Sequence, residues 1–281
     1  MTVIKVRDLE KTFGSERALK GVSFEMKKGE IFGLLGPSGS GKTTTIKILT
    51  GEFEPSSGTV IVNGFNHEQF GKNEYVSKLG ILSDKSSLYE RLTVKDNLEL
   101  FRKLYGAPKG SVERVLKDVG LADQINKTVS KLSKGMKQRI LLCKAVIHKP
   151  DILFLDEPTS ALDPTTAEKI HEMLEGLRDE GTTVLLTTHN MDEATRLCDH
   201  VAFLYQGVIQ DHGGPSELRH KYKRNVVHVT YNDGSQKTID KSADNEALLK
   251  SVLLDEAAVD VRTDFPTLGE VFKKVTGKEL Y

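Results

Sequence analysis

A glycine-rich segment, GPSGSGKTT at residues 36–44, limits the possible folds of this chain more than any other part of it. An apolar run at residues 30–35 precedes it and predicts a buried strand, while residues 43–50 predict a helix. Glycines between a strand and a helix let backbone N–H groups surround an anion, and the helix N-terminus adds a favourable dipole. The sequence therefore predicts a P-loop that binds the phosphates of a nucleoside triphosphate. A chance glycine-rich turn is the alternative, and the match at every fixed position of the motif argues against it.

Two side chains of this segment have distinct expected roles. Lys42 would reach the β and γ phosphates, and the Thr43 hydroxyl would hold Mg²⁺, a cation that keeps several waters and takes few protein ligands. The other residues of the segment expected to contact the nucleotide are Gly36, Pro37, Ser38, Gly39, Ser40, Gly41 and Thr44.

Length and charge narrow the class of protein. The 281 residues allow one large domain, or a main domain with an appendage. Lys plus Arg and Asp plus Glu number 40 each, so overall charge gives no reason to expect binding to nucleic acid or to an anionic membrane. The apolar runs are far shorter than the roughly 18 residues that a membrane-spanning helix needs, so we expect the chain not to cross a membrane by itself.

Two strands are expected before the P-loop strand, at residues 3–9 and 18–26. Between them we expect a loop at residues 11–14 that carries Phe13. An aromatic ring here could fill the core or stack on a planar base, a contact that contributes about a kcal/mol. The position of Phe13 one strand ahead of the P-loop favours stacking on adenine.

A mainly helical segment is expected at about residues 86–142, after a buried strand at residues 79–83. Within it, the sequence LSKGMKQ at residues 132–138 leads into an apolar helix. Ser133 and Gly135 at the entrance of this helix would form an anion-binding end, although such a serine is more often only an N-cap.

Polar residues follow two further buried strands, at residues 151–156 and 181–188. Asp156 ends the first, as expected of the carboxylate that P-loop enzymes deliver to the shell of Mg²⁺. Glu157 comes next and could orient or deprotonate a water, which suggests hydrolysis; two solvated acids are the alternative. His189 ends the second strand and could donate a hydrogen bond to the γ phosphate, although an isolated histidine is usually structural.

The alternation of strands and helices predicts an α/β fold, a P-loop NTPase core with an antiparallel β subdomain and a helical insertion. We expect this domain to occupy residues 1–218. The basic run at residues 219–224 reads as a solvated linker rather than a lipid-binding segment. The hairpin, strand and helices expected after it predict a small C-terminal α+β appendage, so the accessory domain is placed at residues 219–281.

Five motifs in this order resemble the ATP-binding subunit of ABC transporters. They are Walker A at residues 36–44, the signature at 132–138, Walker B ending at 156–157, the D-loop SALD at 160–163 and the switch histidine His189. The form of the signature and the ending FPTLGEVFKKVTG resemble exporter subunits whose membrane permease is a separate polypeptide, a group that includes drug, peptide, lipid and sodium exporters.

The resemblance implies that two ATPase domains close head to tail on two ATP molecules with Mg²⁺. Ser133 and Gly135 of one copy would then bind the γ phosphate held by Lys42 of the other. Glu157 would polarise the attacking water and His189 would hold the γ phosphate, because developing charge is stabilised best by preorganised donors in a water-poor interface.

The resemblance also implies partners. Ser160 and Asp163 in the D-loop would contact the second ATPase subunit, which would be another copy of this chain or a homologue. An integral membrane permease would be the other partner, which places the chain at the cytoplasmic face of the cell membrane. A soluble ABC-type ATPase acting on ribosomes or nucleic acid is the alternative; the single ATPase domain and the balanced charge argue against it.

One position departs from the family pattern. The family usually has a glutamine after the strand at residues 79–83, and this chain has Asp84. A carboxylate offers acceptors and a negative charge that a hard cation favours, so we expect Asp84 to sense Mg²⁺, through a water because of its short reach. A surface aspartate in a loop is the alternative. The helices that follow would receive the permease, which makes residues 86–104 the candidate docking surface.

Overall fold

The computed structural model describes residues 1–160 and 162–278. Their contacts divide into two compact units, the first covering residues 1–214 and the second beginning at Pro215. Residue 218, where we expected the first domain to end, lies inside helix α8 (Pro215–Tyr222).

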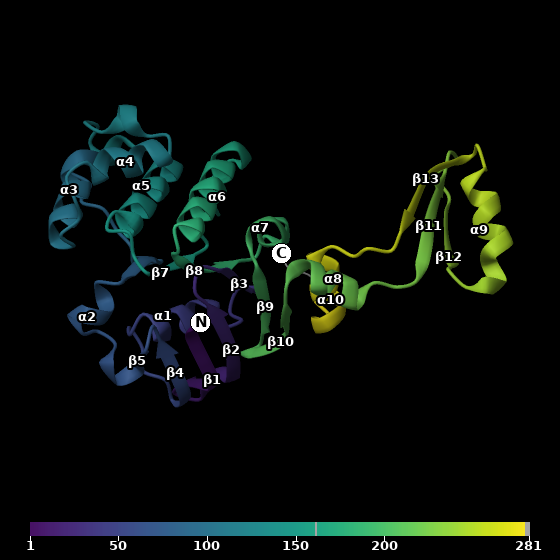
Figure 1. The fold of residues 1–281 in the computed structure, drawn as a ribbon, viewed down its shortest axis with the longest axis horizontal. Coiled ribbons are helices and arrows are strands. Elements are labelled where there is room, and N and C mark those ends of the chain that lie inside the picture. The colour runs from purple at the N-terminus through teal and green to yellow at the C-terminus, as the bar shows by residue number, and fades with distance from the viewer. Residues whose placement is uncertain (161, 279–281) are drawn as a thin grey trace. The chain divides into compact units, whose positions relative to one another are not determined.

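A six-stranded sheet forms the centre of the first unit, in the order β10-β9-β3-β8-β7-β6 (Figure 1). Neighbouring strands from β9 to β6 are parallel, and β10 is antiparallel to β9. Every residue of β3 and β8 is buried, as is typical of parallel strands covered on both faces. The strands are β3 (Ile31–Leu35), β6 (Leu79–Leu82), β7 (Ile152–Asp156), β8 (Thr183–Thr188), β9 (His200–Tyr205) and β10 (Val208–Gly213).

An antiparallel sheet, in the order β2-β1-β4-β5, completes the predicted β subdomain. Its strands are β1 (Thr2–Phe13), β2 (Glu16–Lys27), β4 (Ser57–Val62) and β5 (Phe65–Asn66). Buried side chains from β1, β4, the central sheet and helix α1 (Lys42–Leu49) belong to one hydrophobic core. The expectation of a loop at residues 11–14 is wrong for residues 11–13, because β1 stays paired with β2 as far as Phe13, opposite Glu16.

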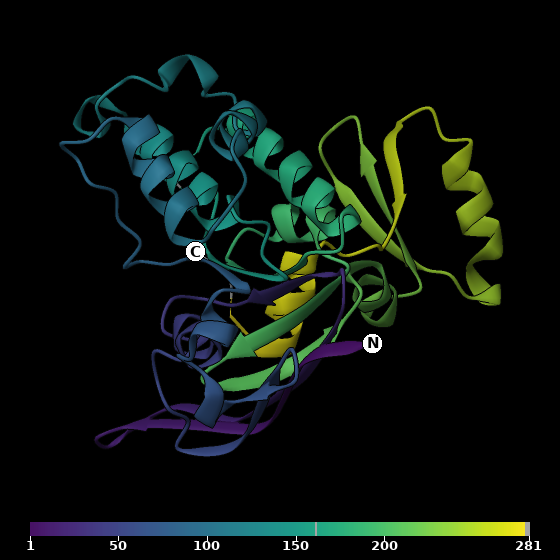
Figure 2. The ribbon, with the colours of Figure 1, turned by 60° about the vertical axis from the view of Figure 1, so that its left-hand side comes forward.

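The helical insertion contains α3 (Val94–Leu104), α4 (Ser111–Asp118) and α5 (Lys134–Val146), which pack against one another (Figure 2). The N-cap of α3 is Thr93, whose hydroxyl accepts a hydrogen bond from the amide of Asp96 at 3.1 Å. The remaining helices of the unit are α2 (Asn73–Val76), α6 (Pro164–Asp179) and α7 (Met191–Leu197).

The second unit is a small α+β arrangement, as predicted. Its sheet has the order β12-β11-β13, with β11 (Val226–Tyr231), β12 (Gln236–Asp240) and β13 (Ala258–Thr263). Helix α9 (Glu246–Leu253) contributes Val252 to a cluster with Val227, Val229 and Ile239.

The expectation of a solvated linker at residues 219–224 is wrong for most of that run, because it continues helix α8 to Tyr222. Helix α8 packs on α10 (Leu268–Thr276), and Leu218 is buried. The Arg219 guanidinium donates to the carbonyl oxygen of Pro266 at 2.8 Å and lies 4.1 Å from the centre of the Phe265 ring. These contacts with residues distant in sequence stabilise a helix that the basic composition does not suggest.

Within the two described ranges, none of the helices combines the length and the apolar character needed to span a lipid bilayer.

Candidate active site

The P-loop connects the carboxyl end of β3 to the first residue of α1, Lys42. Gly36 has no room for a side chain, since a Cβ there would collide with the carbonyl oxygen of Leu204. Gly41 caps α1 with a φ of 111°, in the left-handed region that favours glycine. Both glycines are therefore needed for the loop to turn from strand to helix in this way.

Lys42 lies inside the loop and is 6% exposed. Its Nζ atom donates to the carbonyl oxygens of Gly36 at 2.6 Å and Pro37 at 3.1 Å. Burial lowers the pKa of Lys42, and the carboxylates of Glu157 and Asp156 oppose that shift. The ammonium group thus lies between the loop and two acidic side chains.

Two hydroxyl groups contact the carboxylate of Asp156. Thr43 Oγ1 donates to Asp156 Oδ2 at 2.8 Å, and Thr187 Oγ1 donates to Asp156 Oδ1. Thr187 is the parallel-sheet partner of Asp156, so the register of β7 and β8 sets the second contact. Carboxylate and hydroxyl oxygens are ligands that Mg²⁺ prefers, and Asp156 and Thr43 bring them together.

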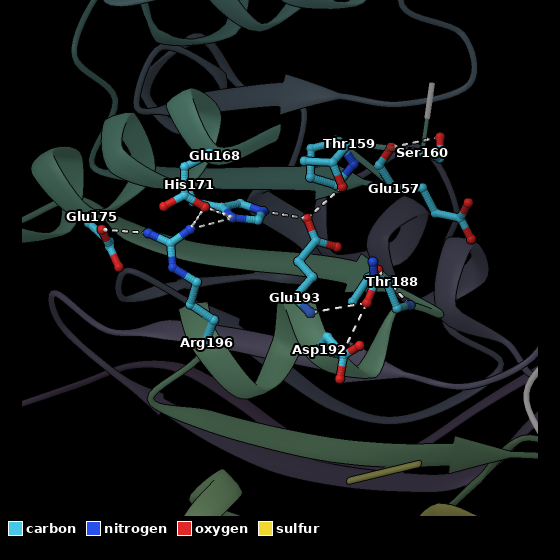
Figure 3. A network of polar contacts seen from close by, with 12 residues as sticks. Glu157, Thr159, Ser160, Glu168, His171, Glu175, Thr188, Asp192, Glu193 and Arg196 are labelled. Atoms are coloured by element: carbon cyan, nitrogen blue, oxygen red, sulfur yellow. Dashed lines mark hydrogen bonds and ion pairs between the residues drawn. The ribbon is translucent and has the colours of Figure 1, made fainter. Parts of the chain in front are cut away.

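Glu157 and His189 form a second polar pair beside Asp156. The distance from His189 Nδ1 to Glu157 Oε1 is 3.1 Å. The φ angle of Glu157 is 48°, a left-handed conformation that is uncommon outside glycine. The amide of Glu157 donates to the carbonyl oxygen of Thr187 at 3.1 Å. The Ser160 hydroxyl donates to the carbonyl oxygen of Glu157 at 3.1 Å (Figure 3). These contacts hold an unusual backbone conformation at the residue predicted to act on water.

The P-loop, Asp156 and Glu157 line one cavity of about 600 Å³. Phe13, Asp84 and Ser160 line it too. The Phe13 ring is 42% exposed and meets the Phe53 ring edge-on, with 5.3 Å between their centres. An exposed aromatic face at the rim of a phosphate-binding cavity is suited to stacking on a nucleobase.

Other predicted site residues lie outside this cavity. Ser133 is the N-cap of α5, and its hydroxyl accepts from the amide of Met136 at 3.2 Å; Gly135 lies in the first turn of that helix. Asp163 is the N-cap of α6, accepting from the amide of Thr166 at 3.0 Å, and hydrogen bonds from Thr166 lower its pKa. The ends of α5 and α6 therefore do not join the P-loop cavity within one chain.

Asp84 lines the cavity, but its nearest charged partner is Lys47 of α1. Lys47 Nζ donates to Asp84 Oδ2 at 3.0 Å, and the Asp84 side chain is 57% exposed. Lys47, Thr187 and the cavity-lining Gln138 were not among the predicted site residues. Thr187 could have been found, because both strands were predicted and parallel pairing brings their polar carboxyl ends together.

Residues 19–160 match the family described as ABC transporter. A fluoroquinolones export ATP-binding protein of Mycobacterium tuberculosis is 38% identical over 286 residues, covering 99% of this chain and 94% of the relative. A solved ATP-binding subunit of an ABC transporter superposes with a TM-score of 0.72 at 29% identity, covering 78% of this chain and 93% of that one.

A second solved structure is an ATP-binding cassette in a dimeric post-hydrolysis state bound to ADP and Pi. It has a TM-score of 0.69 and 29% identity, and the match covers 75% of this chain and 98% of that one. The predicted order of motifs, the P-loop NTPase fold and these similarities agree. The chain belongs to the ABC transporter family and is one of its ATP-binding subunits, an ATPase.

Proposed function

We propose that this chain powers export through a separate membrane permease and that two copies, or this chain and a homologue, close on two ATP molecules. The main support for this proposal is that the predicted ATP-contacting residues do not all line one cavity within a single chain. Lys42, Asp156 and Glu157 meet at one cavity, while the Ser133 end of α5 lies outside it. A second subunit could supply that helix end to the γ phosphate. A relative named as an export ATP-binding protein and a cassette solved as a dimer support this assignment.

Hydrolysis follows from the positions of three side chains. Lys42 and the P-loop amides would bind the phosphates, and Glu157 would orient the attacking water and accept its proton. His189 Nδ1 must carry a proton to donate to the Glu157 carboxylate, so Nε2 can donate to a γ phosphate only when the ring is doubly protonated. The contact with Glu157 therefore determines that Nε2 is the ring nitrogen of His189 that could reach the γ phosphate.

Thr43 and Asp156 would hold Mg²⁺, since their hydroxyl and carboxylate oxygens already lie 2.8 Å apart. When bound, the ion would neutralise part of the charge on the phosphates. Thr187 fixes the other carboxylate oxygen, so the direction in which Asp156 points is set before any ligand binds.

The surface proposed to dock the permease is the segment at residues 86–104. Four large apolar side chains of this segment are solvent-exposed, and they are Tyr89, Leu92, Leu100 and Leu104 at 56%, 38%, 44% and 71%. Exposed apolar side chains gathered in one segment are typical of a protein interaction site. Docking there would place this chain at the cytoplasmic face of the membrane.

Co-expression with the neighbouring genes tests the proposal if one of them encodes a multi-span membrane protein. We expect the chain in the membrane fraction only when that protein is present. The double substitution Leu100→Asp and Leu104→Asp should lower recovery about tenfold, because truncated or charged interface anchors lose most of their binding energy. The matched control makes the same change to Asp at Leu253 and Leu254 of the second unit, which are 70% and 85% exposed. It should leave recovery in the membrane fraction unchanged. Recovery with ribosomes instead of membranes would support the alternative function.

Asp84 is proposed to influence Mg²⁺ binding at the cavity. Asp84→Asn removes the negative charge at nearly constant shape, so we expect the apparent Mg²⁺ affinity or the turnover to fall several-fold. Asp84→Gln should retain part of the activity. The measurement is ATPase rate against Mg²⁺ concentration.

A matched variant distinguishes an effect on Mg²⁺ binding from an effect of the Lys47–Asp84 ion pair. Lys47→Gln breaks the contact with Asp84 while leaving the carboxylate in place. A Mg²⁺ dependence that changes in Asp84→Asn and not in Lys47→Gln assigns the effect to the carboxylate. Equal changes in both variants would reduce Asp84 to a partner of Lys47, and unchanged curves would make it a bystander.

A further inference from the structure

A network of polar side chains, with Glu193 and His171 buried, lies next to the Glu157 turn (Figure 3). At its centre is Glu193 of α7, which is 4% exposed. Its Oε1 atom accepts from the Thr159 hydroxyl at 2.5 Å and lies 3.0 Å from Nε2 of His171, on α6. Arg196 Nη1 lies 3.1 Å from His171 Nδ1 and pairs with Glu168. The network therefore joins α6, α7 and the turn at residues 157–160.

The hydrogen-bond pattern indicates which ring nitrogen of His171 donates to Glu193. An arginine can only donate, so Arg196 requires His171 Nδ1 to accept, which leaves the proton on Nε2 facing Glu193. Burial alone would raise the pKa of Glu193, but hydrogen bonds led by the one from His171 hold that pKa below its ordinary value. Glu193 is therefore an ionised acceptor inside the protein, and its hydrogen bonds are of the strong, charge-assisted kind.

The turn held by this carboxylate includes the strained residue of the site. Glu157, with a φ of 48°, is two residues before Thr159. A non-glycine residue keeps such a conformation only where its surroundings determine it, at a cost of order 1–3 kcal/mol. Thr187 holds the amide side of Glu157, while Ser160 and Thr159 lie on its carbonyl side. The hydrogen bond from Thr159 to the buried Glu193 therefore holds the chain that follows the Glu157 carbonyl group.

The same helix also positions the histidine of the site. Asn190 follows His189 and is the N-cap of α7, accepting from the amides of Asp192 at 3.0 Å and Glu193 at 3.1 Å. Glu193 thus contacts the turn that carries Glu157, and its helix begins at Met191, two residues after His189. A shift of α7 against that turn would change the 3.1 Å contact between Glu157 and His189.

We propose that Glu193 is a positioning residue for ATP hydrolysis, which through Thr159 holds the Glu157 turn and the His189 segment in one fixed arrangement. The inference rests on the proposed role of Glu157. It assigns no contact between Glu193 and the nucleotide, so loss of the anchor should reduce turnover and leave ATP binding intact.

The decisive variant is Thr159→Val, which removes the hydroxyl at nearly constant volume. We expect kcat to fall about tenfold, since small misplacements of catalytic groups have effects of this order or larger. KM for ATP and the affinity for a fluorescent ATP analogue should stay within about twofold, the pattern expected when only the transition state is affected. Thr159→Ser restores the hydroxyl and should restore most of kcat. Glu193→Gln weakens the same hydrogen bond and should lower kcat in the same direction.

The matched control is Thr182→Val. The Thr182 hydroxyl is also buried and donates to the carbonyl oxygen of Pro150 at 3.1 Å, away from the cavity. Its loss should lower the melting temperature without changing kcat. Equal kcat values for Thr159→Val and Thr182→Val would overturn the inference, as would a Thr159→Val defect that appears in KM or that serine fails to rescue.

Failure of the underlying proposal gives a different result. If Glu157→Gln still hydrolyses ATP at a normal rate, then Glu157 does not act on water and the anchor has nothing to position. If Glu157→Gln is inactive and Thr159→Val is normal, the role of Glu157 stands and only the inference about Glu193 falls.

Discussion

A purified Glu157→Gln protein is expected to bind ATP with unchanged affinity and to hydrolyse it about 10² to 10⁴ times more slowly, the usual loss for one general base. The amide keeps the shape of the side chain and an oxygen that can accept from His189, but it does not take a proton from water at neutral pH. Lys42 and Thr43 are untouched, so the nucleotide should stay bound. We expect ATP to hold such subunits together as a dimer.

Steady-state phosphate release measures the rate, and size-exclusion chromatography with and without ATP measures the dimer. Glu25→Gln is the matched control, because Glu25 of β2 forms an exposed ion pair with Lys5 of β1 and does not line the cavity. A Glu157→Gln protein with near-normal ATPase activity would remove Glu157 from the role of base.

The second large effect is expected for Lys42→Ala, in binding rather than in turnover. Hydrogen bonds to charged groups contribute about 1.5–3 kcal/mol each, so ATP affinity should fall by about 10- to 100-fold. Titration with a fluorescent ATP analogue measures the loss. Lys149→Ala is the control, because Lys149 pairs with exposed Glu180 outside the cavity.

The melting temperature of Lys42→Ala has to be followed alongside binding. Lys42 donates to two P-loop carbonyl oxygens, so its removal also takes contacts from the loop itself. A folded Lys42→Ala protein with unchanged ATP affinity would argue against the P-loop as the nucleotide site, and with it against the roles given to Thr43 and Asp156.

Local patterns in the sequence predict most of the first unit, for a physical reason. Parallel strands covered on both faces are continuous apolar runs, so β3, β7 and β8 can be recognised without knowing their neighbours. The polar residues that end these runs then predict the site, because parallel strands deliver their carboxyl ends to one edge. Asp156 and His189 were predicted in this way before the sheet order was known.

The features that were missed depend on contacts between distant segments. Lys47 pairs with Asp84, and Glu193 contacts His171. The partners in each pair are far apart in the sequence, and the spacing of apolar and polar residues gives no sign that they meet. Helix α8 is stabilised because it packs on α10, which follows it in the sequence by more than forty residues. Phe13 belongs to β1 because Glu16 pairs with it, whereas the glycine that follows suggested an earlier end of the strand.

The order of strands in the central sheet also determines when the nucleotide site can form while the ribosome is synthesising the chain. Strand β3, which leads into the P-loop, is made first among the central strands, yet its two neighbours are β8 and β9. At about 5–20 residues per second, roughly 8 to 30 s separate the emergence of β3 from that of β8. During that interval a fully apolar strand lacks both of its hydrogen-bonding neighbours, and the residues around Asp156 arrive before the strand that joins them to the P-loop. ATP stabilises only a formed site, so it can assist the folding of a nascent chain only after His189 has left the ribosome.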